Sequence, residues 1–471
     1  MEKFIQILNP KQKALEINLD SAIYGAFAEI GAGQEVARHF FQAGGAAGTI
    51  AKTISAYDMA MSDAIYGKEE SGRYVCESRL MKMLGREYDI LISRLQEKRS
   101  SDTRFFAFAD TVAARSYGSH TDGHGWMGVR FQNIPGAAAS DVIMHVKLLD
   151  NQNLLQQQAL GRVGVNLIYA CFNYLDNTAH FIRSLMDNLD NERIEIDMIR
   201  VTGPAFKGMD SRLLNLELIK RQYSQALLFD STGNAIQPSD AIYKKNILVL
   251  RGSFRPPTLV NMDMLREGLT SFKKDLPPEE HKSIMVLPEI SMSKLVERGE
   301  VDSSDFLARV DLLAALGQNV LISNKESFWS LNSYLKGLTK KQIGYVLGVY
   351  NLEVLMDESK YAAHSHGLLG ALGQVVGHQS RLYLYPAKDE KSGDITKAAN
   401  IPVAENLKYL MSYLRQNKYL VDVENFHPDH FNIWSRQVLK MIESGEKGWE
   451  EMVPPSIAKT VKEKGLFGFR Q

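Results

Sequence analysis

Residues 119–132, SHTDGHGWMGVRFQ, carry the densest set of side chains that could do chemistry. His120, Asp122 and His124 bear imidazole and carboxylate groups, which can transfer protons near neutral pH. Arg130 follows six residues after His124, and a guanidinium pairs readily with an anionic group. We therefore predict catalytic roles for His120, Asp122, His124 and Arg130.

The glycines of this stretch predict a loop instead of a helix. His120 and His124 stand four residues apart, so that on a helix both would face one metal ion. Glycine occupies positions 118, 123, 125 and 128, however, and no third metal ligand lies nearby. The pattern thus disfavours a metal site and predicts a polar loop at the rim of a pocket, anchored by Trp126 and Phe131.

The segment before this loop should supply further polar groups to the same pocket. The run RFFAFADTVAA, residues 104–114, is typical of a strand, and Asp110 and Arg115 lie toward its end. In α/β proteins the carboxyl ends of strands are the usual place for a ligand. We therefore predict a catalytic role for Asp110 and a ligand contact for Arg115.

A glycine turn near the N-terminus is a second candidate. The apolar run of residues 22–30 leads into GAGQEVARHF, where apolar residues take up helical spacing. Backbone N–H groups at such a helix start can hold a phosphate, which makes Gly31 and Gly33 candidate ligand contacts. Because Val36 and Ala37 stand where a third glycine would complete the dinucleotide fingerprint, a tight turn without a ligand remains the alternative.

Two further segments could contact an anion. AGGAAGTIAKT ends with Lys52 and Thr53, but Ala51 stands where a P-loop has glycine, so close helix packing is an equal explanation. In YKKNILVLRGSFR, residues 243–255, Arg251 and Arg255 are candidate ligand contacts. The basic residues there alternate with apolar ones, and a solvated sheet face would account for them equally well.

Two motif pairs point weakly to phosphate chemistry. Nucleotidyltransferases combine an H-x-G-H signature with a later Ser/Thr-Lys/Arg loop, and this chain has HTDGH at 120–124 and ISMSK at 290–294. The first string has one residue too many. LLFDSTG and VLISN resemble motifs of haloacid-dehalogenase-like phosphatases, but Thr232 replaces the second aspartate that this chemistry needs, which excludes that class.

The elements that must position these residues indicate an α/β protein. The first part alternates strands and helices. Strand-like runs at 141–150 and 193–201 enclose helical stretches and predict an α+β arrangement. From about 282 to 386 short apolar strands alternate with amphipathic helices, which predicts a doubly wound, mostly parallel sheet with SIMVLPEI, QNVLISN, QIGYVLGVY and RLYLYP as neighbouring strands.

We expect three portions from these patterns. They are an N-terminal β/α portion at 1–140, an α+β portion at 141–260, and a doubly wound domain with a helical tail at 261–471. Glu289, Ser323 and Asn324 stand at strand ends of that domain and mark a second expected ligand crevice, with simple helix capping as the alternative.

Composition excludes several classes of protein. The 55 basic and 55 acidic residues balance, so the whole chain has no electrostatic reason to bind nucleic acid or an anionic membrane. No apolar run approaches the roughly 20 residues that span a bilayer, and the first residues do not resemble a signal peptide, so we expect a cytoplasmic protein. The two cysteines are far apart, and we predict no tightly bound transition metal or zinc. The sequence specifies no cofactor.

Several strings resemble an uncharacterised bacterial protein family, and the similarity covers nearly the whole chain. They include GAGQEVARHFFQAGGAAGTIAKT, FFAFADTVAARSY, DGHGWMGVRFQ, QQQALGRVGVNLIY, RGSFRP and GLFGFR. Members carry automatic names, either nicotinate-nucleotide adenylyltransferase or TonB-dependent receptor. The receptor name implies an export signal and many alternating strands of about ten residues, which this sequence does not show. The resemblance transfers no established catalytic residue.

Two functions of different class follow. The first is a cytoplasmic protein that binds a nucleotide or another phosphorylated metabolite, with a nucleotidyltransferase-like enzyme as its catalytic form. The second is a non-catalytic, self-associating homo-oligomer in which the glycine- and alanine-rich segments serve packing and assembly. Retention of a nucleotide by the purified protein and its sedimentation behaviour distinguish the two.

Overall fold

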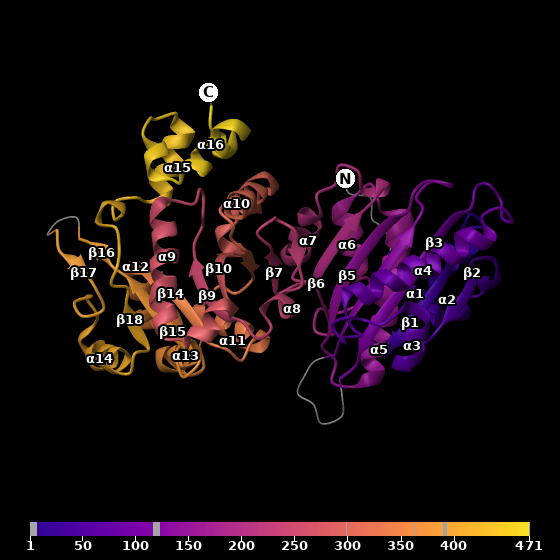
Figure 1. The fold of residues 1–471 in the computed structure, drawn as a ribbon, viewed down its shortest axis with the longest axis horizontal. Coiled ribbons are helices and arrows are strands. Elements are labelled where there is room, and N and C mark those ends of the chain that lie inside the picture. The colour runs from indigo at the N-terminus through magenta and orange to yellow at the C-terminus, as the bar shows by residue number, and fades with distance from the viewer. Residues whose placement is uncertain (1–6, 116–122, 298, 363, 390–392, 471) are drawn as a thin grey trace. The chain divides into compact units, whose positions relative to one another are not determined.

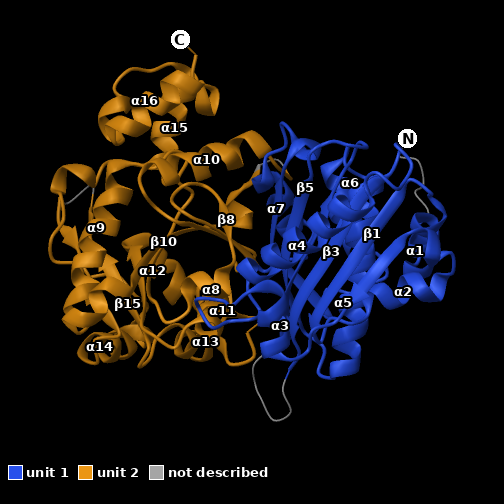
Figure 2. Cartoon of the chain, turned by 45° about the vertical axis from the view of Figure 1, so that its right-hand side comes forward, with its two compact units in different colours: residues 1–225 blue, residues 226–471 orange. Residues whose placement is uncertain are grey.

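The structure, a computed structural model, describes residues 7–115, 123–297, 299–362, 364–389 and 393–470. The described chain forms two compact units, residues 1–225 and 226–471 (Figure 2). Each unit contains one large β-sheet with helices on both faces (Figure 1).

Unit 1 is built on a six-stranded sheet. Its strands are β1 (Ile23–Gly31), β2 (Ile50–Ile54), β3 (Arg104–Ala113), β4 (Gly123–Phe131), β5 (Ser140–Leu148) and β6 (Ile194–Thr202). Their order across the sheet is β2-β1-β3-β4-β5-β6. β1 is parallel to both of its neighbours, whereas β3 to β6 are joined by antiparallel pairing.

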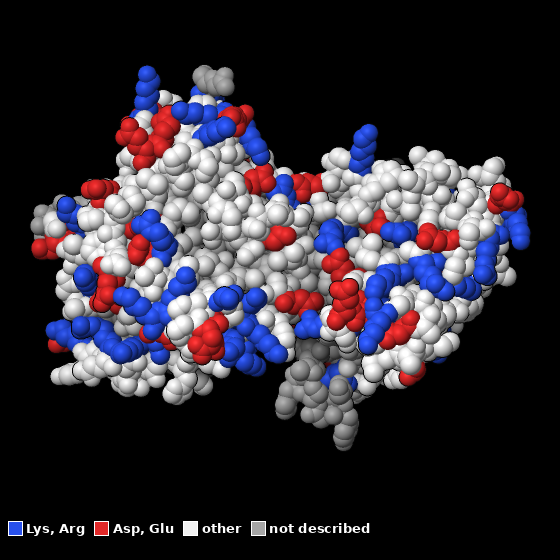
Figure 3. All heavy atoms as spheres, viewed as in Figure 1, with Lys and Arg blue, Asp and Glu red and all other residues white. Residues whose placement is uncertain are grey.

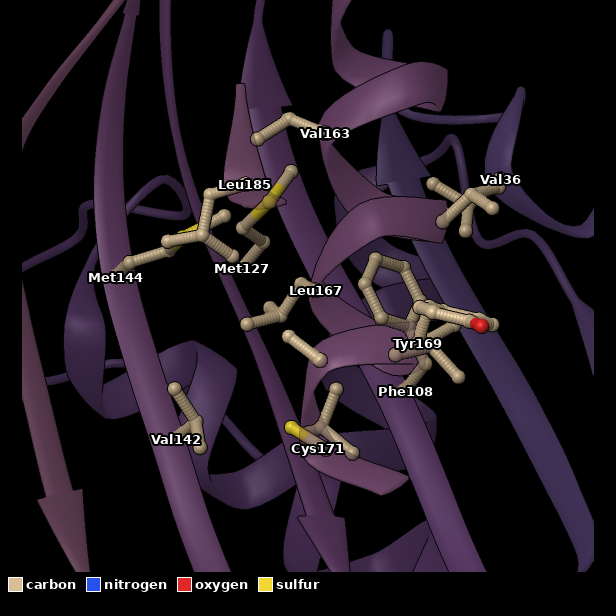
Figure 4. Close-up of a cluster of buried hydrophobic side chains, with 14 of the residues drawn as sticks. Val36, Phe108, Met127, Val142, Met144, Val163, Leu167, Tyr169, Cys171 and Leu185 are labelled. Carbon is tan, nitrogen blue, oxygen red and sulfur yellow. The ribbon is translucent and has the colours of Figure 1, made fainter. Parts of the chain in front are cut away.

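The helices of unit 1 cover the two faces of this sheet, some in direct contact with the strands and others through a neighbouring helix. They are α1 (Pro10–Leu19), α2 (Val36–Ala43), α3 (Met59–Tyr66), α4 (Glu77–Leu95), α5 (Asn153–Asn173), α6 (Thr178–Leu185) and α7 (Ser211–Lys220). The main core lies between the sheet and α5, which is buried on nearly all sides (Figure 4). Gly164 lets α2 lie directly on α5, because a Cβ there would overlap the side chain of Val36.

Unit 2 is built on an eight-stranded sheet with the order β18-β15-β14-β9-β10-β13-β7-β8. Its strands are β7 (Ala226–Phe229), β8 (Ala235–Ile236), β9 (Asn246–Arg251), β10 (Ile284–Ser291), β13 (Val320–Ser323), β14 (Ile343–Gly348), β15 (Ser380–Tyr385) and β18 (Leu420–Asp422). The six strands from β18 to β13 are parallel, and β7 and β8 extend the sheet in antiparallel fashion. Two small hairpins, β11 (Val296–Glu297) with β12 (Glu300–Val301) and β16 (Ala387–Lys388) with β17 (Ile395–Thr396), stand apart from it.

Helices connect the parallel strands of unit 2 across both faces. They are α8 (Pro238–Ile242), α9 (Leu259–Lys274), α10 (Ser303–Ala315), α11 (Phe328–Leu338), α12 (Val349–Met356), α13 (Gly367–Val375) and α14 (Lys408–Gln416). The chain ends in α15 (Ser435–Ser444) and α16 (Pro455–Lys464), which pack on α10 around a small apolar cluster of their own.

This architecture confirms the expected fold class, an α/β protein whose second part is doubly wound and whose C-terminal end is helical. The four runs expected as neighbouring strands are β10, β13, β14 and β15 of one sheet, with β9 inserted between β14 and β10. The expected boundary at 140/141 coincides with the start of β5, which pairs with β4, and the one at 260/261 falls inside α9. No helix in the described part of the chain is long and apolar enough to cross a membrane.

The prediction of a loop for residues 119–132 is wrong for the described residues, because Gly123–Phe131 form β4 in the middle of the sheet. The glycines there serve close packing. A Cβ on Gly128 would lie 2.6 Å from the carbonyl oxygen of Val142, and a Cβ on Gly125 would lie 2.8 Å from a methyl group of Val112. His120 and Asp122 lie outside the described residues.

Candidate functional site

The polar residues of β3 and β4 are divided between the two faces of the unit 1 sheet. Asp110 pairs with Met127, and His124 pairs with Ala113. Because successive side chains of a strand point to opposite faces, Asp110 lies on the face covered by α5 and His124 on the opposite face. The structure therefore does not bring Asp110 and His124 into one pocket.

Asp110 belongs to a buried pair of carboxyl groups under the glycine turn. It lies beside Glu29 in the register of the parallel strands β1 and β3, and both side chains are buried. Within the described residues neither carboxyl oxygen of Asp110 has a hydrogen-bond partner. A Cβ on Gly33 would overlap the Asp110 carboxyl group, so only glycine lets the turn lie directly on this acid.

Burial changes the acidity of both groups. The pKa of Asp110 is raised well above its ordinary value, first by desolvation and then by the nearby Glu29, while the backbone N–H of Ile30 opposes the rise without reaching hydrogen-bond geometry. Desolvation also raises the pKa of Glu29 to about 7, although the N–H groups of Val36 and Ala37 counteract it. The pair thus retains protons at pH values where ordinary carboxyl groups have lost them.

Glu29 also takes the place that a phosphate would occupy at the start of α2. Its carboxylate accepts hydrogen bonds from the backbone N–H groups of Val36 at 2.8 Å and Ala37 at 3.3 Å. Gly31 and Gly33 shape the turn, and Gly31 has a positive φ of 76°. The first amides of α2 are therefore already satisfied by a carboxylate of the protein itself.

On the opposite face of the sheet, three side chains from β4, β5 and β6 form a hydrogen-bonded row. Nδ1 of His124 lies 3.1 Å from Nε2 of His145, and Nδ1 of His145 lies 2.6 Å from Oδ1 of Asp197. Lys147 approaches the other oxygen of Asp197 at 3.4 Å. The ring of Trp126 stands edge-on to His145, with 5.1 Å between ring centroids. Sequence analysis identified only the first member of this row, His124.

The remaining residues predicted in unit 1 are engaged in other contacts. Arg130 makes a bidentate ion pair with Asp141 at 2.7 and 2.8 Å. Arg115 donates to Asn151 at 2.9 Å. Lys52 pairs with the buried Glu87 at 2.5 Å, and its neighbour Thr53 in β2 is exposed.

In unit 2, Arg251 ends β9 in a buried polar network. Its guanidinium donates to both carboxylate oxygens of Glu289, at 2.6 and 3.1 Å, and to the backbone oxygens of Lys325 and Glu326. Ser323 donates to Glu289 at 2.6 Å. The polar strand ends of β9, β10 and β13 thus come together as expected for Glu289 and Ser323. Their mutual bonds rigidify the edge of the sheet.

Arg255 follows in the loop after β9 and forms an ion pair with Asp305 at 2.5 Å. Asp305 also pairs with Arg309, whose guanidinium donates to the carbonyl oxygen of Lys294 at 2.7 Å. These contacts tie the loop after β9 to the loop after β10. Arg255 is therefore held at the same edge of the sheet as Arg251.

The start of α12 is an uncapped part of this edge. The helix begins directly after Gly348, the last residue of β14, and no described side chain caps its first turn. A Cβ built on Gly348 meets no atom within 4 Å. By contrast, α9 starts with a capping box of Thr258 and Asn261, and α10 and α11 are capped by Asp302 and Ser327.

Sequence analysis missed Glu29, His145 and Asp197, yet each left a signal. All three are ionisable residues inside runs that otherwise read as buried strands, AFAEI, VIMHV and IEIDMI. An ionisable residue at such a position must find a partner or change its protonation. In the described part of the chain, no three His, Cys, Asp or Glu side chains are arranged to hold a metal ion.

Comparison with known proteins yields weak structural likenesses. No family model matches the chain, and no curated protein matches it. The competence/damage inducible protein CihA from Agrobacterium tumefaciens has 16% identity and a TM-score of 0.26 over 36% of this chain and 98% of its own. A CinA superfamily protein from Enterobacter cloacae has 13% identity and a TM-score of 0.25 over 36% of this chain and 94% of its own.

A third structure, from Vibrio parahaemolyticus, is described as a "Putative Nicotinate-nucleotide Adenylyltransferase". It has 15% identity and a TM-score of 0.26 over 48% of this chain and 96% of its own. The adenylyltransferase name therefore recurs, whereas the receptor name does not recur among these three. At these scores the likenesses carry no argument about function, which must come from the site itself.

Proposed function

We propose that unit 2 binds a nucleotide or another phosphorylated metabolite at the carboxyl ends of β9, β10 and β14. The observation that supports this most directly is the order of the strands. From β9 the chain proceeds through α9 to β10 on one side, and from β14 it proceeds through α12 to β15 on the other. In open α/β sheets, ligands bind in the crevice where the connections reverse in this way.

The start of α12 supplies the group that would receive the phosphate. The first amides of a helix have no partner within the helix, and the helix dipole adds positive potential at this end. Since Gly348 leaves the space before the helix open, an anion can approach the backbone directly. In unit 1 the equivalent amides of α2 are closed by Glu29, so unit 2 is the better place for an anion.

Cationic side chains reinforce this preference. Lys294 is exposed just beyond β10. The pKa of its ammonium is lowered, first by desolvation and then by the nearby Arg251, while Glu289 and Glu326 oppose the fall. An anion bound beside this lysine would stabilise its charged form. The attraction is local, because positive and negative side chains are interspersed over the face of the molecule in Figure 3.

We propose binding, and not nucleotidyl transfer, as the role of this edge. At the start of α9, the polar side chains are those of Thr258 and Asn261, which are hydrogen-bonded to each other and to the backbone. They stabilise the start of the helix and are engaged in these bonds.

A charge placed at Gly348 tests the proposal. Gly348 has φ −81° and ψ 166°, which any residue adopts, so an aspartate there can cap α12 without strain. We expect Gly348→Asp to keep or raise the melting temperature and to weaken phosphate binding at least ten-fold, about 1.4 kcal/mol. The probes are AMP, ATP, NAD and inorganic phosphate, measured by calorimetry after mass spectrometry of the purified protein.

Gly348→Ala is the matched control, because it adds a side chain and leaves the amides open. It should bind within about two-fold of the natural protein. Lys294→Gln should weaken binding several-fold, with a larger effect at low salt. Equal affinity for Gly348→Asp and Gly348→Ala, or no binding of any probe, would refute the proposal.

Self-association remains the alternative prediction and has one specific feature in its favour. Tyr57, Met59 and Met61, at and before the start of α3, are 80%, 60% and 57% exposed. Adjacent exposed apolar side chains of this kind are typical of contact surfaces. Sedimentation of the natural protein and of a Met59→Lys, Met61→Lys variant decides whether these residues join copies of the chain.

A further inference from the structure

The row formed by His124, His145 and Asp197 on the unit 1 sheet has the geometry of a proton relay. We propose that His124 is a general base and that His145 and Asp197 are positioning residues that hold its proton-accepting nitrogen in place. The substrate would be a small molecule whose reaction begins with loss of a proton from a hydroxyl group or from a water molecule. This site does not depend on the anion site proposed for unit 2.

The hydrogen bonds determine where the protons lie when both rings are neutral. The carboxylate of Asp197 can only accept, so Nδ1 of His145, 2.6 Å away, must donate. Nε2 of His145 then carries a lone pair and accepts from Nδ1 of His124 at 3.1 Å. With its Nδ1 protonated, His124 offers Nε2 as the basic nitrogen.

The same row can stabilise the product of proton transfer. When Nε2 of His124 takes a proton, the ring becomes an imidazolium whose Nδ1–H still points at His145. Its positive charge is then stabilised through His145 by Asp197, in the way that a buried acid supports the histidine of a catalytic triad. The base is regenerated when Nε2 of His124 gives the proton to the product or to solvent.

Burial orders the row from the surface inward. His124 is half-buried, His145 is 2% exposed and Asp197 is 1% exposed. Trp126 flanks His145 on the sheet. Nζ of Lys147 lies 3.4 Å from a carboxylate oxygen of Asp197 and 3.5 Å from one of Glu195. The carboxylate of Asp197 is thus screened from water, and the Lys147 ammonium offsets part of its effect on the histidines.

The backbone places these residues with precision. They stand on three neighbouring strands of one sheet, which is a more rigid support than a loop. The ladder between β5 and β6 is irregular next to His145, where Met198 pairs with His145 and Ile196 pairs with Val146. Asp197 sits in this bulge, and bulges are a common device for aiming a side chain at a functional site.

Chemical modification of His124 tests the proposal in the full chain. Its Nε2 should attack a carbonyl carbon of diethyl pyrocarbonate and form an N–C bond, releasing carbon dioxide and ethanol. Peptide mass spectrometry gives the rate at each histidine and each pH. Asp197→Asn and His145→Gln should slow modification of His124 at least five-fold and move the midpoint of its pH profile downward. His366, which is exposed in unit 2, should react at an unchanged rate.

Asp141→Asn is the matched control, because Asp141 lies on the same face but pairs with Arg130 outside the row. It should leave the His124 rate and pH profile unchanged. Nitrogen-15 spectra of the natural protein provide a test without any substitution, and they should show His124 protonated at Nδ1 in its neutral form. An Nε2–H tautomer, or equal rates and midpoints in all variants, would overturn the proposal and leave a purely structural contact.

Discussion

The carboxyl pair beneath the glycine turn makes the stability of unit 1 depend on pH in an unusual direction. Glu29 has a folded-state pKa of about 7 against an ordinary value of 4.5. An acid whose pKa is raised by folding stabilises the folded state fully below pH 4.5, and this contribution is lost as the pH rises to 7. Each pKa unit corresponds to about 1.36 kcal/mol. The free energy of unfolding therefore falls by about 3 kcal/mol, and the equilibrium constant for opening rises roughly 300-fold.

Replacement of Glu29 by glutamine removes the titrating group. A glutamine retains one of the two hydrogen bonds to α2, since its amide has one oxygen where the carboxylate has two. We therefore expect Glu29→Gln to flatten the fall in stability between pH 5 and pH 7.5. Some of the fall should persist, because Asp110 titrates in the same direction.

Hydrogen exchange measured by mass spectrometry is the suitable assay, since peptides from β1 and β3 report the opening of unit 1 within the whole protein. Protection, corrected for intrinsic exchange, should fall from pH 5 to pH 7.5 by more in the natural chain than in Glu29→Gln. Peptides from β14 in unit 2 are the internal control. Protection that is constant or rises with pH in the natural chain, or the same slope in the variant, would refute the reasoning.

Further outcomes are expected from substitutions in unit 1 and from metal analysis of the whole chain. Asp110→Asn should raise the hydrogen-exchange protection of β3 at pH 7.5 and have less effect at pH 4. The reason is that the pKa of Asp110 is raised, so that burying this acid becomes costly only as the pH increases. An equal change in protection at pH 4 and pH 7.5 would contradict this. Gly128→Ala should destabilise unit 1 by about 1 to 3 kcal/mol in denaturant unfolding, since its Cβ meets the backbone of Val142. Arg130→Ala should lower the melting temperature, because Asp141, 8% exposed, would lose its bidentate partner; an unchanged value would show that the pair is solvated. Elemental analysis of the untagged protein should return well under about one zinc per chain, as two isolated cysteines and scattered histidines do not form a closed site.

The pattern of apolar residues by itself determined most of the secondary structure and the fold class. Short apolar strands between amphipathic helices require a sheet covered on both faces, and this sufficed to place β10, β13, β14 and β15 in one parallel sheet. Periodicity reports burial along one segment, however, and does not report which distant strand lies beside it. The insertion of β9 between β14 and β10 is therefore a tertiary result.

The glycines show the same limit at close range. In residues 119–132 they predict a loop, because glycine is costly inside a regular element. The structure places Gly125 and Gly128 in a central strand, where neighbouring backbone and side chains leave no room for a Cβ. Only the packed sheet can distinguish a glycine that permits a turn from one that permits close contact.

The candidate site shows which information comes from the sequence and which comes from the tertiary structure. Residue types alone predicted a proton-transfer role for His124 and a ligand contact for Arg251. The partners of these residues lie on neighbouring strands but far away in the sequence. His145 and Asp197 stand 21 and 73 residues after His124, and Glu289 stands 38 residues after Arg251. Hydrogen bonds and desolvation act through space, so the protonation and the pairing of these groups are decided by the sheet that brings the strands together.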